Sequence, residues 1–188
     1  MRRFILACAG LLACCVFSIG GGASQATAAI TAAKATQQHQ AAIKWLGSQI
    51  VSYQKATWRW ERLMGVPLTA TQGRMLAEMS IPDVKQAARG WHRLAAEARQ
   101  KAQNPPHRAA FLCIHRFEGS WPSNTGNGYY GGLQMYLGFQ QTYAPWLLRT
   151  KGTAAHWTPL EQMWTAEKAA KSRGFDPWPN TARSCGLL

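Results

Sequence analysis

The sequence predicts a mostly helical α+β protein in which a helical hairpin precedes a compact domain with one small β-hairpin. Two long stretches before residue 104 carry apolar residues at spacings of three and four, the periodicity of a buried helical face. Pro105-Pro106 then interrupts the helical pattern, and Asn127-Gly128 beyond it is a strong tight-turn signal. The chain therefore divides into a helical region, residues 29–104, and a second domain, residues 105–188.

The N-terminus has the pattern of a secretory signal peptide, residues 1–28. Arg2-Arg3 precedes an apolar run, Phe4–Ile19, and small residues lead to an A-x-A site with cleavage expected after Ala28. The apolar run is shorter than the roughly 18 residues expected of a membrane span, so we expect no stable membrane anchor after cleavage. A lipoprotein cleavage box ending at Cys14 is the alternative, although apolar sequence continues beyond it. We expect a secreted, wall-associated protein.

The cysteines support export. Removal of the signal peptide takes away three of the five, Cys8, Cys14 and Cys15, and leaves only Cys113 and Cys185. Two cysteines in an exported chain favour one disulfide between them. Two free buried thiols are the alternative, which suits a cytosolic protein better.

The charge is strongly basic, with 21 Lys and Arg against 8 Asp and Glu and a net charge of +13. Loss of Arg2 and Arg3 with the signal lowers this to +11. In a cytosolic protein such a charge suggests nucleic acid, but an exported chain meets anionic wall polymers or an anionic membrane surface instead. Charge that only aids solubility is the other interpretation.

Two helices are expected in the helical region. The first spans about residues 32–64, has apolar positions at Ile43, Leu46, Ile50 and Tyr53, and ends before Gly65-Val66-Pro67. Trp58 and Trp60 cannot share a helical face, and we expect both to pack against the second helix or the C-terminal domain. Stacking of one of them on a sugar or a partner is the alternative.

The remaining elements follow from caps and turns. The second helix starts after Ser80, with Pro82 and Asp83 in its first turn, and ends near Ala102. Further helices are expected at residues 108–118, 138–149 and 159–172, the last with Thr158 as N-cap and Glu161 completing a capping box. Residues 124–136 form the β-hairpin candidate.

Glu118 is the candidate catalytic acid. Cleavage of a glycosidic bond needs a carboxyl that protonates the leaving oxygen, and Phe117 and Trp121 are the apolar neighbours expected to shield it. A surface ion pair with an arginine is the alternative for any glutamate. His115 stands three residues before it, as metal ligands on a helix can, but no further ligands accompany the pair, and we expect no metal.

The run Asn124–Gln134, NTGNGYYGGLQ, together with the upstream glutamate and Trp178-Pro179 before the last cysteine, resembles the transglycosylase-like domain of the resuscitation-promoting factor family. The resemblance covers about the last 75 to 80 residues. It implies a compact lysozyme-like fold and cleavage of peptidoglycan glycan strands without a cofactor. The family carries its glutamate directly after the cysteine, whereas Glu118 stands five residues after Cys113.

The resemblance implies that Glu118 acts as general acid and then base, and that Gln134 positions the sugar or braces the glutamate. Tyr129 and Tyr130 are candidate sugar-stacking groups, and the substrate-binding candidates in or beside the motif also include Trp121, Asn124 and Thr125. The backbone of Gly131 and Gly132 is expected to approach the glycan closely, and Asp176 is the other acid near the cleft.

Two other functions remain open. A wall-binding module that has kept the fold and lost the activity is the main alternative to an enzyme. The other alternative is that the basic helical region is the functional part, as a binder of anionic polymers or a membrane surface. The sequence does not distinguish transglycosylation from hydrolysis.

Overall fold

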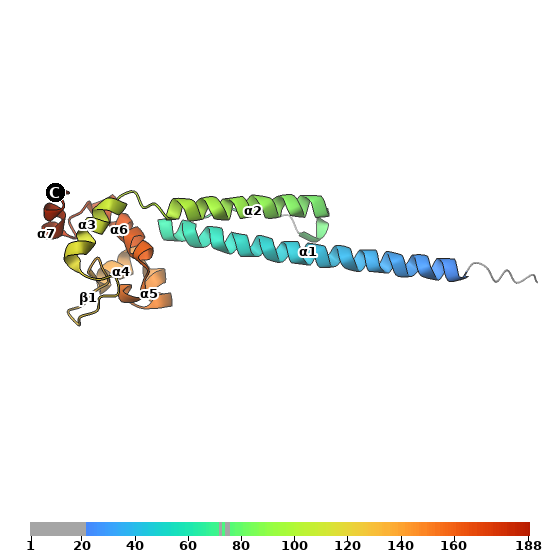
Figure 1. Cartoon of the computed structure of the whole chain (residues 1–188), viewed down its shortest axis with the longest axis horizontal. Coiled ribbons are helices and arrows are strands. Elements are labelled where there is room, and N and C mark those ends of the chain that lie inside the picture. The colour runs from blue at the N-terminus through green and yellow to red at the C-terminus, as the bar shows by residue number, and fades with distance from the viewer. Residues whose placement is uncertain (1–21, 72, 74–75) are drawn as a thin grey trace, which may run out of the picture. The chain divides into compact units, whose positions relative to one another are not determined.

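Figure 1 shows the computed structural model, which describes residues 22–71, 73 and 76–188. Two compact units divide the chain, Met1–Ala42 and Ile43–Leu188. The elements in order are α1 (Gly22–Met64), η1 (Leu76–Glu78), α2 (Ile81–Ala102), α3 (Arg108–Glu118), β1 (Tyr129–Tyr130), β2 (Met135–Tyr136), α4 (Leu137–Tyr143), α5 (Pro145–Lys151), η2 (Ala154–His156), α6 (Pro159–Arg173) and α7 (Pro179–Ser184). The fold class is therefore confirmed as mostly helical α+β with a small two-stranded sheet.

Helix α1 begins earlier than predicted, at Gly22, and ends at Met64 as predicted, where Gly65 turns the chain with φ 70°. Residues 1–21, which hold most of the predicted signal peptide and the Cys14 box, lie outside the described residues. Residues 22–28 are the first turns of α1, and cleavage after Ala28 stays a prediction. Of the helices in the described part of the chain, none combines the length and the apolar character that a membrane crossing requires.

The second unit begins with the predicted helical hairpin. Leu46 and Ile50 of α1 pack with Val84 and Ala88 of α2 in a small hydrophobic cluster. The hydroxyl oxygen of Ser80 accepts from the backbone N–H of Asp83, so the predicted N-cap of α2 is confirmed.

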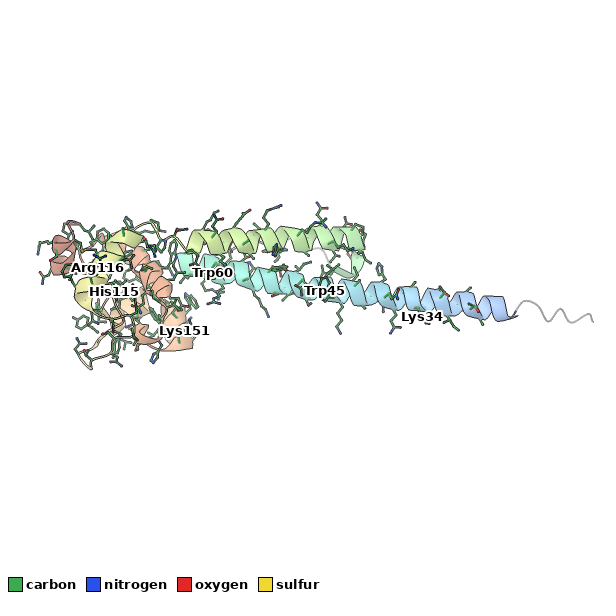
Figure 2. The ribbon with its side chains drawn as sticks, in the orientation of Figure 1. Lys34, Trp45, Trp60, His115, Arg116 and Lys151 are labelled. Atoms are coloured by element: carbon green, nitrogen blue, oxygen red, sulfur yellow. A yellow bond between two sulfur atoms is a disulfide. The ribbon has the colours of Figure 1, made fainter. Side chains whose placement is uncertain are left out.

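The two tryptophans of α1 pack in different directions, as expected for residues two apart. The Trp58 ring meets Trp91 of α2 edge to face, with centroids 6.1 Å apart, and its Nε1 donates to the Thr69 carbonyl at 2.8 Å. Trp60 packs instead against the core of the C-terminal half. Figure 2 labels Trp60 near the end of α1.

The ends of the hairpin belong to the main hydrophobic core. Leu63 and Met64 of α1 and Ala102 of α2 join the buried cluster that also contains Phe111 and many residues of α4 to α7. The indole nitrogen of Trp164 donates to the Ala102 carbonyl at 2.7 Å. The core is thus continuous across Pro105, and the domain boundary at residue 104 stays a prediction.

The predicted β-hairpin is present, but its strands are joined by a different turn. Tyr129 pairs with Tyr136 and Tyr130 with Met135, so the connecting turn is Gly131–Gln134 and not Asn127-Gly128. The Asn127-Gly128 turn instead closes a single β-bridge between Asn124 and Tyr130. Both turns therefore form, and the buried glycine pair lies in the one that joins the two strands.

One helical prediction in this part of the chain needs correction, and those at residues 108–118 and 159–172 are confirmed. The helix expected at residues 138–149 is two helices, α4 and α5, because Pro145 disfavours helical angles at Ala144, which has φ −147° and ψ 51°. Helix α6 starts as predicted, with Thr158 and Glu161 forming a complete capping box. The closing segment holds a further short helix, α7, that the sequence did not predict.

Candidate functional site

Glu118 is the last residue of α3. Phe111 and Ile114 anchor this helix in the core, each with no exposed surface. Gly119 ends it with φ 145°, a conformation that favours glycine, and its N–H donates to the His115 carbonyl at 3.2 Å. A Cβ at Gly119 would stand 3.2 Å from the Ser123 hydroxyl, so the chain turns tightly and leaves Glu118 at the helix end.

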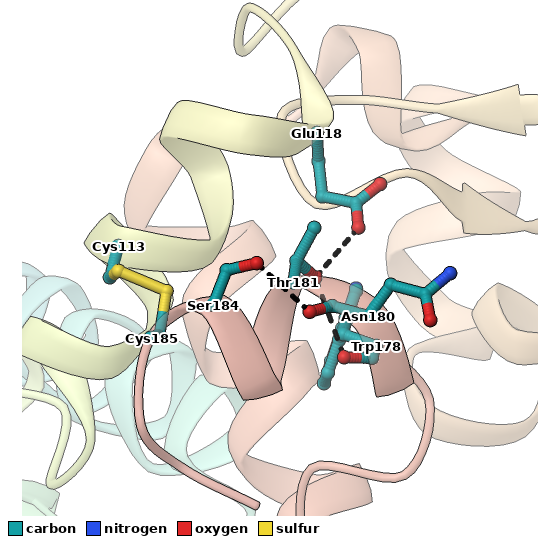
Figure 3. Close-up of a disulfide and its surroundings, with 7 residues drawn as sticks. All are labelled: Cys113, Glu118, Trp178, Asn180, Thr181, Ser184 and Cys185. Atoms are coloured by element: carbon teal, nitrogen blue, oxygen red, sulfur yellow. Dashed lines mark hydrogen bonds between the residues drawn. A yellow bond between two sulfur atoms is a disulfide. The ribbon is translucent and has the colours of Figure 1, made fainter.

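The Glu118 carboxylate has one bonded oxygen. The Thr181 hydroxyl on α7 donates to Oε1 at 2.9 Å (Figure 3). Within the described part of the chain, Oε2 has no hydrogen-bond partner, and in Figure 3 it points away from α7. One oxygen is therefore held by the protein, and the other makes no hydrogen bond among the described residues.

The predicted disulfide is present. Cys113 of α3 and Cys185 at the end of α7 are bonded, with Cα atoms 6.1 Å apart and a sequence separation of 72. The disulfide therefore ties the helix that carries Glu118 to the helix that carries Thr181 (Figure 3).

A pocket of about 170 Å³ lies between the β-hairpin and the segment that joins α6 to α7. Gln134 lines it and has φ 47°, an uncommon angle outside glycine, with its Nε2 donating to the Gly131 carbonyl at 2.9 Å. That nitrogen is also 3.7 Å from the position of a Cβ at Gly119, the residue after Glu118. Glu118 does not line the pocket itself, and Gln134 is the lining residue that lies beside the end of α3. The other lining residues are Tyr129, Met135, Tyr136, Phe139, Arg173, Asp176, Pro177 and Trp178.

The structure brings together only part of the predicted site. Tyr129, Gln134 and Asp176 share the pocket lining, whereas the other candidates do not belong to it. Trp121 stacks on the His115 ring with centroids 4.0 Å apart, and Tyr130 packs against the hydrophobic core. The remaining two, Asn124 and Thr125, are exposed on the loop before β1.

The shielding expected around Glu118 is only partly present. Phe117 is 59% exposed, since it projects from the end of α3 into solvent. Trp121 is half-buried, but the face it presents inward is covered by His115. The His115 ring also lies 3.2 Å from the Gly132 carbonyl, so it is engaged in packing the hairpin. In the described ranges, no three His, Cys, Asp or Glu side chains gather as a metal site would require.

Gly131 and Gly132 face inward, contrary to the expected approach to the glycan. Both are buried. A Cβ at Gly131 would collide with the Gln162 amide, and one at Gly132 would collide with the His115 ring. The space that the missing side chains leave is therefore filled by the protein itself.

Gln162 of α6 is the structural residue that the sequence did not indicate. It has no exposed surface, and its Oε1 accepts from the Gly132 N–H at 2.8 Å. Its Nε2 donates to the carbonyls of Trp121 and Ala154, both at 2.9 Å. One side chain thus holds the loop after α3, the hairpin turn and η2 together. No local sequence signal marks a glutamine for this role.

The start of α6 is stabilised by charge. Lys151 donates to both carboxylate oxygens of Glu161, at 2.6 and 2.8 Å. Burial by itself raises the pKa of Glu161. The hydrogen bonds and positive charge of Lys151, together with hydrogen bonds from the N–H and hydroxyl of Thr158, lower the pKa by more than burial raises it, so the net pKa lies below the usual value. Glu161 is therefore held ionised at the base of the helix that carries Gln162.

Comparison with known proteins agrees with this geometry. The family model described as "Transglycosylase-like domain" matches residues 116–181, which include Glu118, the hairpin and Thr181. Resuscitation-promoting factor RpfE of Mycobacterium tuberculosis is 38% identical over 65 residues, 35% of this chain and 35% of that protein. Resuscitation-promoting factor Rpf1 of Corynebacterium glutamicum is 36% identical over 69 residues, 37% of this chain and 35% of that protein.

The chain thus matches about a third of the length of the curated relatives. The residues that the family model matches, 116–181, exclude both cysteines of the disulfide. Within that segment the likeness is consistent, because the family match and both relatives agree on the same domain. Residues 116–181 therefore match a transglycosylase-like domain, and this part of the chain is similar to resuscitation-promoting factors.

Proposed function

We propose that this chain is a secreted peptidoglycan-cleaving enzyme that breaks the β-1,4 bond between N-acetylmuramic acid and N-acetylglucosamine. The observation that carries the proposal is Glu118. Its carboxylate keeps one oxygen without a hydrogen bond among the described residues, and Gln134, whose side-chain nitrogen lies beside Gly119, lines a pocket in the same transglycosylase-like domain.

The mechanism follows from a single carboxyl group. Glu118 protonates the glycosidic oxygen through its free oxygen, and positive charge develops on the sugar ring as the bond breaks. The resulting carboxylate then removes a proton from the group that attacks the anomeric carbon. In transglycosylation that group is the C6 hydroxyl of the same muramic acid, which closes a 1,6-anhydro ring. In hydrolysis it is water.

Asp176 is the acidic side chain that lines the same pocket as Gln134, and it is exposed. It is the residue that would hold the attacking water in the hydrolytic route. Asp176→Asn separates the two routes, because it should lower hydrolysis and leave formation of the anhydro product unchanged. A hydrolytic product that persists in this variant would remove Asp176 from the mechanism.

Aromatic side chains support sugar binding at the pocket. Tyr129 is 46% exposed and Tyr136 47% exposed, and their rings meet edge to face with centroids 6.2 Å apart. Such half-exposed rings give a sugar a flat apolar face to stack on. Gln134 would position the sugar from the other side. Trp121, Tyr130, Asn124 and Thr125 remain candidates for a longer glycan that extends beyond the pocket.

The experiment is digestion of purified peptidoglycan by the wild-type protein and by Glu118→Gln, with the released muropeptides identified by mass spectrometry. We expect release by the wild type and none by the variant, because the amide cannot donate the proton. A muramic residue that has lost one water marks transglycosylation. If neither protein releases fragments and both sediment with the wall, the chain is a wall-binding module and the enzyme proposal is wrong.

Anionic wall polymers are the second proposed partner, and the outer face of α1 favours them. The exposed cations Lys44, Lys55, Arg59 and Arg62 recur along residues 43–62 at helical spacings, and the described residues pair none of their side chains with an acid. Trp45 on the same helix is 62% exposed (Figure 2). Glu61, the one acid in this stretch, is buried and bonded to Thr69.

Electrostatic retention on a polyanion should fall steeply with salt. We therefore expect sedimentation with intact walls at low salt and release as the ionic strength rises. The triple substitution of Lys55, Arg59 and Arg62 by glutamine should shift that release to lower salt, with Arg93, Arg99 and Lys101 of α2 replaced likewise as the matched control. Equal shifts in both variants would show that net charge alone acts, without a role for the α1 face.

A further inference from the structure

We infer that Thr181 is a positioning residue that fixes which oxygen of Glu118 transfers the proton. This inference rests on the proposed function. It starts from the hydrogen bond at 2.9 Å between the Thr181 hydroxyl and Oε1 of Glu118. The two oxygens of a carboxyl exchange places by rotation about one bond, and a donor fixed to one of them leaves the other as the reactive oxygen.

A hydroxyl suits this role better than a cation. When Glu118 carries its proton on Oε2, Oε1 is a carbonyl oxygen and still accepts from Thr181. When Glu118 is ionised, Oε1 accepts from the same donor. The bond therefore persists through both protonation states of the catalytic cycle. A lysine or arginine in the same place would favour the ionised state strongly and oppose the uptake of the proton.

Helix α7 is held at both ends, and Thr181 lies between the two attachments. At the start of the helix, the indole nitrogen of buried Trp178 donates to the Leu133 carbonyl at 2.7 Å. At its end, Cys185 is bonded to Cys113 of α3. A helix of six residues has little stability of its own, so these attachments set its position.

Two contacts join α3 to α7, the disulfide and the hydrogen bond from Thr181 to Glu118, and they lie about one helical turn apart. Cys113 and Glu118 are five residues apart on α3, and Thr181 and Cys185 are four apart along α7 and its C-cap, against 3.6 residues per helical turn. The disulfide therefore holds the Thr181 hydroxyl beside Glu118 before a substrate arrives (Figure 3). Such preorganisation is what a catalytic carboxyl requires.

Other polar side chains of α7 do not share this role. The Ser184 hydroxyl donates to the Asn180 carbonyl of its own helix at 3.2 Å, and Asn180 is exposed. Ser184 is therefore a matched control, since it carries a hydroxyl on the same helix without contact to the glutamate. Thr181→Val removes the hydroxyl at nearly constant shape, and Thr181→Ser keeps it.

The test measures kcat and KM on soluble, uncrosslinked glycan strands for wild type, Thr181→Val, Thr181→Ser, Ser184→Ala and Glu118→Gln. We expect Thr181→Val to lower kcat by about 10- to 100-fold with KM nearly unchanged, because misplacement of a reacting group acts on the chemical step. Thr181→Ser and Ser184→Ala should stay within about threefold of wild type. Thermal unfolding of each variant checks that the fold is retained.

The possible outcomes distinguish the role of Thr181 from the proposed function. A Thr181→Val enzyme with the wild-type kcat refutes the role of Thr181 while the proposed function stands. A folded Thr181→Ser enzyme as slow as Thr181→Val refutes it too, because the hydroxyl would then be irrelevant. An inactive wild-type protein would overturn the proposed function and the inference together, and an active Glu118→Gln variant would do the same.

The disulfide's share is tested in the Cys113→Ala/Cys185→Ala background. If the disulfide holds Thr181 in place, Thr181→Val should lower kcat by a smaller factor in this double variant than in the intact protein, because the hydroxyl is already misplaced. If Thr181→Val lowers kcat by the same factor in both proteins, then Trp178 and the core hold α7 in position without the disulfide. The comparison of the threonine variants in the intact protein is independent of whether this double variant folds.

Discussion

Gln162→Leu should destabilise the protein far more than an ordinary polar substitution. The glutamine amide satisfies the Gly132 N–H at 2.8 Å and the carbonyls of Trp121 and Ala154 at 2.9 Å. Leucine has a similar volume, so little cavity forms. The buried Gly132 N–H and the Trp157 carbonyl, to which Nε2 also donates at 3.1 Å, then lose their partner, at about 1–3 kcal/mol each. The Ala154 carbonyl keeps the Trp157 N–H at 3.1 Å. We expect the free energy of unfolding to fall by about 4 kcal/mol, within a total of about 5–15 kcal/mol for a typical domain.

The assay is urea unfolding followed by tryptophan fluorescence, with Gln141→Leu as control. Gln141 is exposed on α4, and the same substitution there should change the unfolding free energy by about 0.5 kcal/mol or less. Because Gln162 also holds the turn before Gln134, activity should fall in the folded fraction of the variant. A loss below about 1 kcal/mol would refute the reasoning, since the freed groups would then have found water or new partners.

Two further predictions concern the same domain. Replacing Cys113 and Cys185 by alanine should lower the unfolding free energy by about 4 kcal/mol, the loop-entropy value for a crosslink with a sequence separation of 72. The measurement is urea unfolding of the oxidised wild type and of the substituted protein. A much smaller difference between them would mean that the unfolded chain is already compact. Lys151→Met should destabilise by about 1–3 kcal/mol at pH 7, because it removes two hydrogen bonds to buried Glu161. The folded pKa of Glu161 is lowered below 4.5, so this stabilisation is present above pH 4.5 and is lost as the pH falls through the folded pKa. Unfolding curves of wild type and variant should therefore converge in acid, and a gap that persists below that range would mean that Lys151 acts through packing.

The sequence predicted the features that depend on neighbours along the chain. The helical periodicity around Leu46 and Ile50, the cap at Ser80 and the capping box at Thr158 were confirmed, because each rests on contacts within a turn or two of helix. The pairing of Cys113 with Cys185 was also predictable, since the expected export leaves only these two cysteines.

Local sequence signals did not predict the structure where two of them competed, or where contacts with residues far away in sequence decided the outcome. Asn127-Gly128 predicted the turn of the hairpin, but the strands are joined by Gly131–Gln134. The missing side chains of Gly131 and Gly132 looked like room for a glycan, whereas Gln162 and His115 fill that room from α6 and α3. Whether a glycine faces a ligand or the interior depends on partners far away in sequence, which a local pattern does not contain.

The sequence by itself therefore determined most of the helices, the crosslink and Glu118 as the candidate acid. Only the tertiary structure decided what surrounds that glutamate. Thr181 stands 63 residues away in sequence, and it reaches the carboxylate because Trp178 and the disulfide hold α7 beside α3. Such contacts are set by how buried surfaces pack against each other, so they exist only once the chain has folded.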